Sequence, residues 1–148
     1  MKQVALIQNK IRLRHAFTEF YKAGEDLVGS DQSFILEMRS VPKTREQEER
    51  YHAMVGEIAK QQTVMGRKLS AESWKRLLVD AFKHDTKDDP QLARLWAEVG
   101  DMQMAPALNH DGFVMLGEQT RKFPKLLASA FIEWLFAYGA EVGVTFRR

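Results

Sequence analysis

The sequence contains no cysteine, which excludes a disulfide scaffold, thiol catalysis and cysteine-ligated zinc, and fits a reducing cytoplasm. Its four histidines lack the spacing of a metal-ligating motif, and no glycine-rich phosphate loop follows an expected strand. No apolar run reaches the roughly 18 residues of a membrane span, and the N-terminus has no signal-like apolar region. We therefore expect a cytoplasmic protein without catalytic residues, metal, cofactor or membrane contact.

The remaining composition is typical of a globular domain. The 148 residues are 45% hydrophobic and 28% charged, which excludes disorder and predicts one domain over residues 1–148. The net charge is only +2, so an anionic partner would need a local patch of cations. The charge is unevenly distributed, because residues 84–117 hold two basic and six acidic side chains and both flanks are basic.

The first 40 residues predict a strand, a helix and a second strand. Residues 3–7 read as a short strand, and apolar residues at helical spacing predict a helix over 10–23 that ends at Gly24. Phe34, Leu36 and Met38 alternate with Ile35, Glu37 and Arg39, which predicts a strand over 34–39 with one buried face. This order is typical of a small layered α+β unit.

Residues 43–148 predict a mainly helical part. Thr44 and Ser70 are plausible N-caps for helices over 44–65 and 71–84. Further helices are expected over 91–103 and 124–142, and a short strand over 113–116. The predicted fold class is therefore α+β, with a small sheet and packed helices in a single domain.

The last helix is apolar almost all round. Such a helix must be covered on every side, either as a central core helix or by a second subunit. In the second case a homodimer interface would bury Phe131, Trp134, Leu135 and Tyr138.

Basic residues gather at the starts of the predicted helices and in the loops before them. Cations in such places neutralise phosphates, and helix starts offer free backbone N–H groups. The candidate DNA-binding residues are Lys43, Arg45, Arg50, Arg67, Lys68, Lys75, Arg76, Arg121, Lys122 and Lys125. The nearest aromatic residues, which are either platforms for bases or core residues, are Tyr51, Trp74, Trp96 and Phe123.

A small metal-dependent nuclease is the main alternative. It would use acidic side chains from residues 85–111 together with His110, which lies in an Asn-His-Asp-Gly turn. The simpler explanation of these acidic side chains is that they form a solvated helix end and loop without a catalytic role. A third possibility is a protein-interaction module that does not touch DNA.

Several motifs resemble the NinB (Orf) family of bacteriophage recombination proteins. The run Ser70 to Lys75 matches the family's "AESWK" helix start, and Lys43 to Glu48 resembles its "R-S/T-x-x-Q-N" opening. Gly112 to Gly117 and Ala137 to Val144 resemble its "GFVxxG" strand and its closing "AYG-x-E-x-G-V". The chain departs from the pattern at Glu48, His52 and the Gln119-Thr120 pair, and residues 85–108 are longer than the matching loop.

This resemblance implies a non-enzymatic recombination mediator in the host cytoplasm. It implies an intertwined or ring-like homodimer that binds single-stranded DNA, contacts the host single-strand-binding protein and helps a strand-exchange protein load.

Overall fold

The computed structural model describes residues 2–100, 103–116 and 120–147. The chain forms two compact units, an N-terminal unit over Met1–Arg39 and a helical unit over Ser40–Arg148. The prediction of a single domain over 1–148 stays a prediction. None of the helices in the described ranges is long and apolar enough to cross a membrane.

One long helix, α1 (Lys10–Gly29), forms the centre of the N-terminal unit. It begins where the Asn9 side chain accepts a hydrogen bond from the Arg12 backbone N–H at 2.8 Å. The sequence predicted that this helix ends at Gly24, which is wrong, because the helix continues to Gly29 and Gly24 lies buried within it. A Cβ there would lie 2.9 Å from the Phe34 ring, so the missing side chain lets that ring approach the helix.

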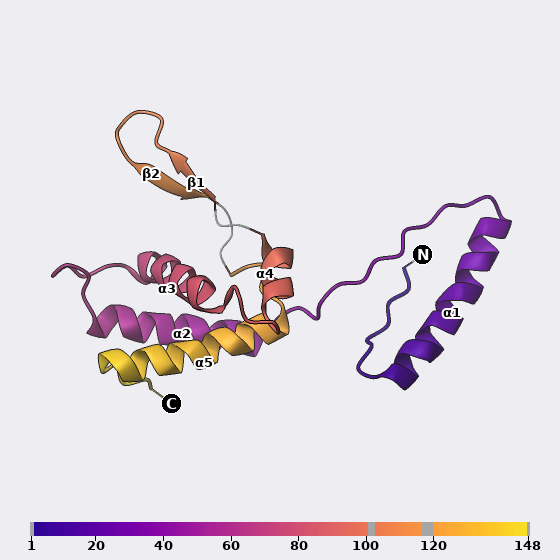
Figure 1. Cartoon of the computed structure of the whole chain (residues 1–148), viewed down its shortest axis with the longest axis horizontal. Coiled ribbons are helices and arrows are strands. Elements are labelled where there is room, and N and C mark those ends of the chain that lie inside the picture. Colours follow the sequence, from indigo (N-terminus) through magenta and orange to yellow (C-terminus); the bar gives the residue numbers. More distant parts are fainter. Residues whose placement is uncertain (1, 101–102, 117–119, 148) are drawn as a thin grey trace. The chain divides into compact units, whose positions relative to one another are not determined.

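The two strands predicted for the N-terminal unit are wrong. Residues 3–7 and 34–39 are extended but belong to no strand (Figure 1). Phe34, Leu36 and Met38 were expected to form a buried face, yet they are 49%, 61% and 84% exposed. Alternation predicts an extended chain, but a strand also needs a neighbour for its backbone groups, and the unit supplies none among its described residues.

Three long helices, α2 (Arg45–Gln61), α3 (Ala71–Thr86) and α5 (Lys125–Val142), build the helical unit, with the short α4 (Ala93–Val99) beside them (Figure 1). Thr44 and Ser70 cap α2 and α3 as predicted, and Thr44 forms a full capping box with Gln47. Helix α2 ends four residues earlier than predicted. A tight turn follows, in which Val64 and Arg67 pair and Met65 and Gly66 both have positive φ.

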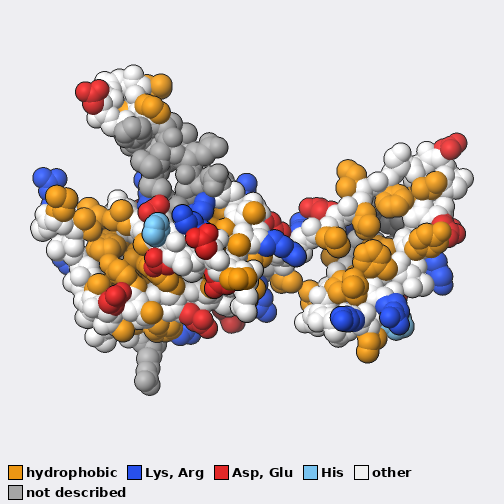
Figure 2. Space-filling view, viewed as in Figure 1, with side chains coloured by type: hydrophobic (Ala, Val, Ile, Leu, Met, Phe, Trp, Pro, Cys, Tyr) orange, Lys and Arg blue, Asp and Glu red, His pale blue; other side chains and the backbone are white. Residues whose placement is uncertain are grey.

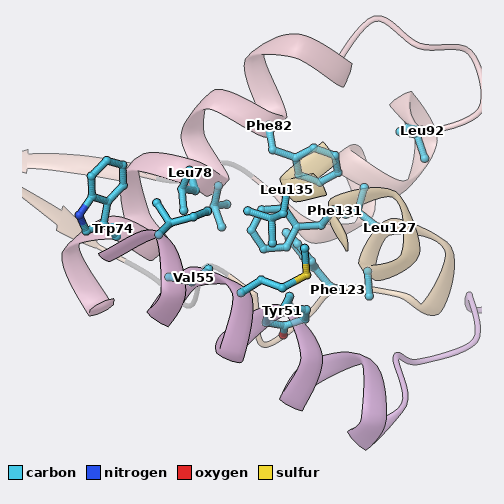
Figure 3. Close-up of a cluster of buried hydrophobic side chains, with 14 of the residues drawn as sticks. Tyr51, Val55, Trp74, Leu78, Phe82, Leu92, Phe123, Leu127, Phe131 and Leu135 are labelled. Carbon is cyan, nitrogen blue, oxygen red and sulfur yellow. The ribbon is translucent and has the colours of Figure 1, made fainter. Parts of the chain in front are cut away.

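The core of the helical unit lies where α2, α3 and α5 meet (Figure 3). Tyr51 of α2, Phe82 of α3 and Phe131 of α5 are all fully buried. The Phe131 ring lies 5.4 Å from the Tyr51 ring and 5.1 Å from the Phe82 ring. The apolar last helix is therefore covered largely within its own chain.

Strands β1 (Gln103–Pro106) and β2 (Phe113–Leu116) pair as an antiparallel hairpin. The strand over 113–116 was predicted. Strand β1 was not, because its first residue was assigned to the helix predicted over 91–103 and the following residues to no element. Apart from two isolated bridges, this hairpin is the only strand pairing in the described parts of the chain. The predicted α+β fold with helices packed on a sheet is wrong, because the described core is built by helices and their connecting segments.

Candidate nucleic-acid interface

Two segments about 80 residues apart in sequence lie side by side where α2 and α5 begin. The Lys125 backbone N–H donates to the Val41 carbonyl at 2.7 Å, and Pro42 forms a bridge with Pro124. The Lys43 ammonium donates to the Arg121 carbonyl at 2.6 Å. We call the cations gathered here, namely Lys43, Arg121, Lys122 and Lys125, the basic junction.

The two helices that begin at the basic junction run in the same direction. The Gln47 amide, near the start of α2, donates to the Lys125 carbonyl and to Ser129 Oγ in the first turns of α5. At the other end, the Gln62 amide donates to the Val142 carbonyl at 3.1 Å. Parallel helices bring their positive dipole ends together, which adds to the positive potential of the junction.

A second set of cations lies at the connection between α2 and α3. Arg67 follows the tight turn and is exposed, while the Lys68 ammonium donates to the Lys60 carbonyl. Lys75 forms an ion pair with Glu72 at 3.5 Å, and Arg76 is exposed. We call Arg67, Lys68, Lys75 and Arg76 the basic connection.

The structure thus divides the predicted DNA-binding residues into two groups. Helix α2 has 17 residues, so its ends are about 25 Å apart. Arg45 is the first residue of α2, at the end that meets the basic junction, and Arg50 lies further along the same helix. Arg45 pairs with Glu49 at 3.0 Å, and the Arg50 guanidinium lies 5.2 Å from the centre of the Phe136 ring. The assignment of all ten residues to DNA binding stays a prediction.

His52 is linked electrostatically to both groups. Partial burial lowers its pKa most, followed by the nearby charge of Lys75, and Lys43 acts in the same direction. Glu48 and Glu72 oppose this shift. His52 Nε2 lies 3.8 Å from Glu48. The lowered pKa favours the neutral imidazole, and the sequence did not reveal that His52 lies within reach of cations from both groups.

Three acidic residues of the nuclease alternative, Asp85, Asp89 and Glu98, have structural partners. Asp85 accepts a hydrogen bond from the Trp134 indole at 2.9 Å, and Asp89 accepts one from the Gln91 backbone. Glu98 accepts one from the Ser40 backbone at 3.2 Å, and hydrogen bonding to Ser40 lowers its pKa.

His110 and Asp111 of that alternative lie between the two strands of the hairpin. The His110 ring packs against Gly112 of its own turn, where a Cβ would lie 3.2 Å away. Asp101 lies outside the described residues. Among those described, no three histidine, aspartate or glutamate side chains gather as a metal ion would need.

The four residues predicted for a dimer interface divide into two kinds. Phe131 and Leu135 are fully buried within this chain, and the assignment of the four residues to a dimer interface stays a prediction. Trp134 and Tyr138 are half-buried, and their rings stack 5.4 Å apart. At 100° per residue the two pairs lie on adjacent parts of one face of α5, and Trp134 and Tyr138 pack at the edge of the core that Phe131 and Leu135 enter.

Apolar surface that the sequence reasoning did not single out lies on the N-terminal unit. Tyr21 and Val28 of α1 are 69% and 61% exposed, and Ile35 is 93% exposed. The available signal was the number of apolar residues in a segment too small to bury them.

Comparison with known proteins connects the chain to one family. No curated protein matches the chain. A solved structure described as "Structural Genomics, NinB" is similar, with 21% identity, a TM-score of 0.48, and coverage of 99% of this chain and 90% of that one. The model of the family described as NinB protein matches residues 1–147. The chain therefore belongs to the NinB family, and with it to the proteins of bacteriophage recombination.

Proposed function

We propose that this chain is a recombination mediator that binds single-stranded DNA without cutting it. In this role it would help a strand-exchange protein load onto DNA covered by the host single-strand-binding protein. Family membership supports the connection to recombination. The basic junction carries the proposal of DNA binding, because four cations and the positive ends of two helices meet there.

The mode of binding that fits this surface is contact with the phosphate backbone. Trp74, Trp96 and Phe123 are at most 4% exposed, so these rings are core residues and offer no stacking platform for bases. Binding through cations alone is independent of sequence and depends steeply on salt. This behaviour suits a protein that must act anywhere along a DNA strand.

The proposal includes a homodimer. Among its described residues, 2–39, the N-terminal unit buries only Ala16 and Gly24, which is too little to stabilise it alone. Its exposed apolar side chains would be covered by a second copy of the chain. A dimer would also double the number of basic junctions that one DNA strand can contact.

The test is a titration with single-stranded and double-stranded oligonucleotides of equal length at two salt concentrations. The wild-type protein is expected to bind single strands with no product of cleavage in magnesium. The double variant Arg121→Ala/Lys122→Ala is expected to weaken binding and to flatten the salt dependence by a slope of about 0.7 for each phosphate that is no longer neutralised. Lys43 is left unchanged, because its ammonium also supports the Arg121 carbonyl.

Two further variants make the result specific. Arg67→Ala/Lys68→Ala removes two cations from the basic connection, and Lys87→Ala/Arg94→Ala removes two from the acidic region 84–117. If the control pair weakens binding as much as Arg121→Ala/Lys122→Ala does, the loss is one of net charge and the junction is not the binding surface. Unchanged affinity in both variants of the two basic sets would overturn the proposal of DNA binding through them.

A further inference from the structure

We propose that α1 pairs in antiparallel orientation with α1 of a second copy of this chain. The contact would be made by an apolar stripe, which we define as Leu13, Phe17, Tyr21 and Val28. This inference rests on the homodimer of the proposed function, and it names the surface and the orientation of the pairing. It differs from the interface on α5 that the sequence predicted.

The four side chains of the apolar stripe share one face of α1 and are exposed to solvent. At 100° per residue its four side chains fall within an arc of about 80° on α1. Leu13 and Phe17 are 40% and 49% exposed, and Tyr21 and Val28 are more exposed still. Figure 2 shows hydrophobic side chains spread over the surface of the N-terminal unit. Two helices that join such stripes bury both of them at once.

The N-terminal unit cannot supply the missing cover itself. Among its described residues α1 buries only Ala16 and Gly24. Gly24 lies inside the arc of the stripe and is covered by the Phe34 ring, whereas the four stripe side chains themselves stay 40–69% exposed. A 20-residue helix with so small a core is marginal in water. Association of two such helices would therefore stabilise the helix as well as the pair.

The charges on α1 identify a second copy as the partner and set the orientation. Residues 10–14 of the helix carry Lys10, Arg12 and Arg14 with no acid, whereas residues 19–26 carry Glu19, Glu25 and Asp26 with Lys22 as their one cation. Among the described residues, none of these seven side chains has an ion-pair partner within the unit. Antiparallel pairing places each basic half against an acidic half, whereas parallel pairing places like charges together.

One pair of residues makes this complementarity specific. Arg14 and Glu25 are eleven residues apart, which is three turns plus about 20°, so both lie on the same flank of the apolar stripe. When two identical helices pack in antiparallel orientation, the same flanks face each other. Arg14 of each copy then faces Glu25 of the other, and the ion pair forms twice.

The first experiment measures the mass of the full chain by sedimentation over a range of concentrations. Phe17→Glu puts a charge into the stripe and is expected to raise the dimer dissociation constant at least ~10-fold. Ile11→Glu is the matched control, because Ile11 is 74% exposed on the same helix but lies about 120° from Phe17. Its dimer is expected to match the wild type.

The second experiment does not depend on a destabilising variant, and it uses the absence of cysteine from the chain. An equimolar mixture of Arg14→Cys and Glu25→Cys proteins is expected to form a disulfide-linked pair under mild oxidation. Each protein alone is expected to form far less. Efficient linkage of Arg14→Cys with itself, and little in the mixture, would overturn the antiparallel orientation.

The outcomes separate this inference from the proposed function. A dimer that Phe17→Glu leaves intact, with no linkage in the cysteine mixture, refutes the α1 pairing and leaves the homodimer standing. A wild-type monomer at all concentrations refutes both, and a stripe seated on the helical unit of the same chain would give this result. DNA binding is measured separately, so its loss or retention does not decide the pairing.

Discussion

Replacing Phe131 by alanine tests whether α5 belongs to the core of the chain or to an interface between copies. The ring is fully buried, and it lies 5.4, 5.1, 5.8 and 6.4 Å from four other aromatic rings. Truncating a buried phenylalanine costs about 3–5 kcal/mol, and loss of several aromatic pairs favours the upper end. We therefore expect the free energy of unfolding to fall by about 4–5 kcal/mol. This corresponds to a drop in Tm of about 15 °C for a chain of this length.

The assay is urea unfolding followed by tryptophan fluorescence, which reports on the helical unit because Trp74, Trp96 and Trp134 all lie there. Phe136→Ala is the matched control on the same helix. Phe136 is 42% exposed, so its loss should cost only about 1 kcal/mol. The oligomeric state of both variants should equal that of the wild type.

Two results would refute this reasoning. Equal destabilisation by Phe131→Ala and Phe136→Ala would mean that the burial of Phe131 does not reflect the core. A Phe131→Ala protein that dissociates from dimer to monomer, with its unfolding free energy unchanged, would place Phe131 at an interface.

Three further predictions follow from individual contacts. Tyr51→Phe should leave Tm unchanged or slightly raised, because the buried hydroxyl has no hydrogen-bond partner of normal geometry. Its burial also raises the pKa of Tyr51 to about 12. A clear loss of Tm in the variant would reveal a partner. The pKa of His52 is lowered in the folded protein, so the unfolded chain binds more protons, and the free energy of unfolding should fall as the pH drops below about 6.5. His52→Gln should reduce the dependence of this free energy on pH, measured by urea titrations. An unchanged dependence would contradict the prediction. Gly139→Ala should lower Tm, because a Cβ would lie 2.6 Å from Phe146 Cζ and displace the segment that Gln61 holds by two hydrogen bonds. Gly56→Ala is the control and should not lower Tm, because a Cβ there meets nothing. An equal loss of Tm in both variants would contradict the contact.

The helix starts show what could be predicted from the sequence. Thr44 and Ser70 cap their helices through hydrogen bonds to residues three positions later. Because both partners lie within one turn, the pattern of residue types is sufficient to predict the contact. The helical parts of α1, α3 and α5 were predicted for a related reason, since apolar spacing reports directly which face is buried.

The errors at Gly24 and at the strands involve contacts with residues outside the element itself. Gly24 was predicted to end α1, but it serves as the contact point for Phe34, and a glycine within a helix looks the same in sequence as one at its end. The strands over 3–7 and 34–39 were predicted from alternation, which says nothing about whether a neighbouring strand exists. Strand β1 was missed because its hairpin partner defines it.

The candidate site also combines features that the sequence predicts with features that depend on tertiary packing. The sequence by itself determined which cations stand near helix starts, that the chain lacks a recognisable metal motif, and which family its motifs resemble. Only the tertiary structure decided that Lys43 contacts Arg121 and that Lys125 contacts Val41, while Arg67 and Lys68 lie at the far end of α2. It also decided that Phe131 and Leu135 face inward. Residue types and short-range spacing encode local hydrogen bonds and amphipathic faces, whereas the meeting of segments 80 residues apart depends on how those faces pack.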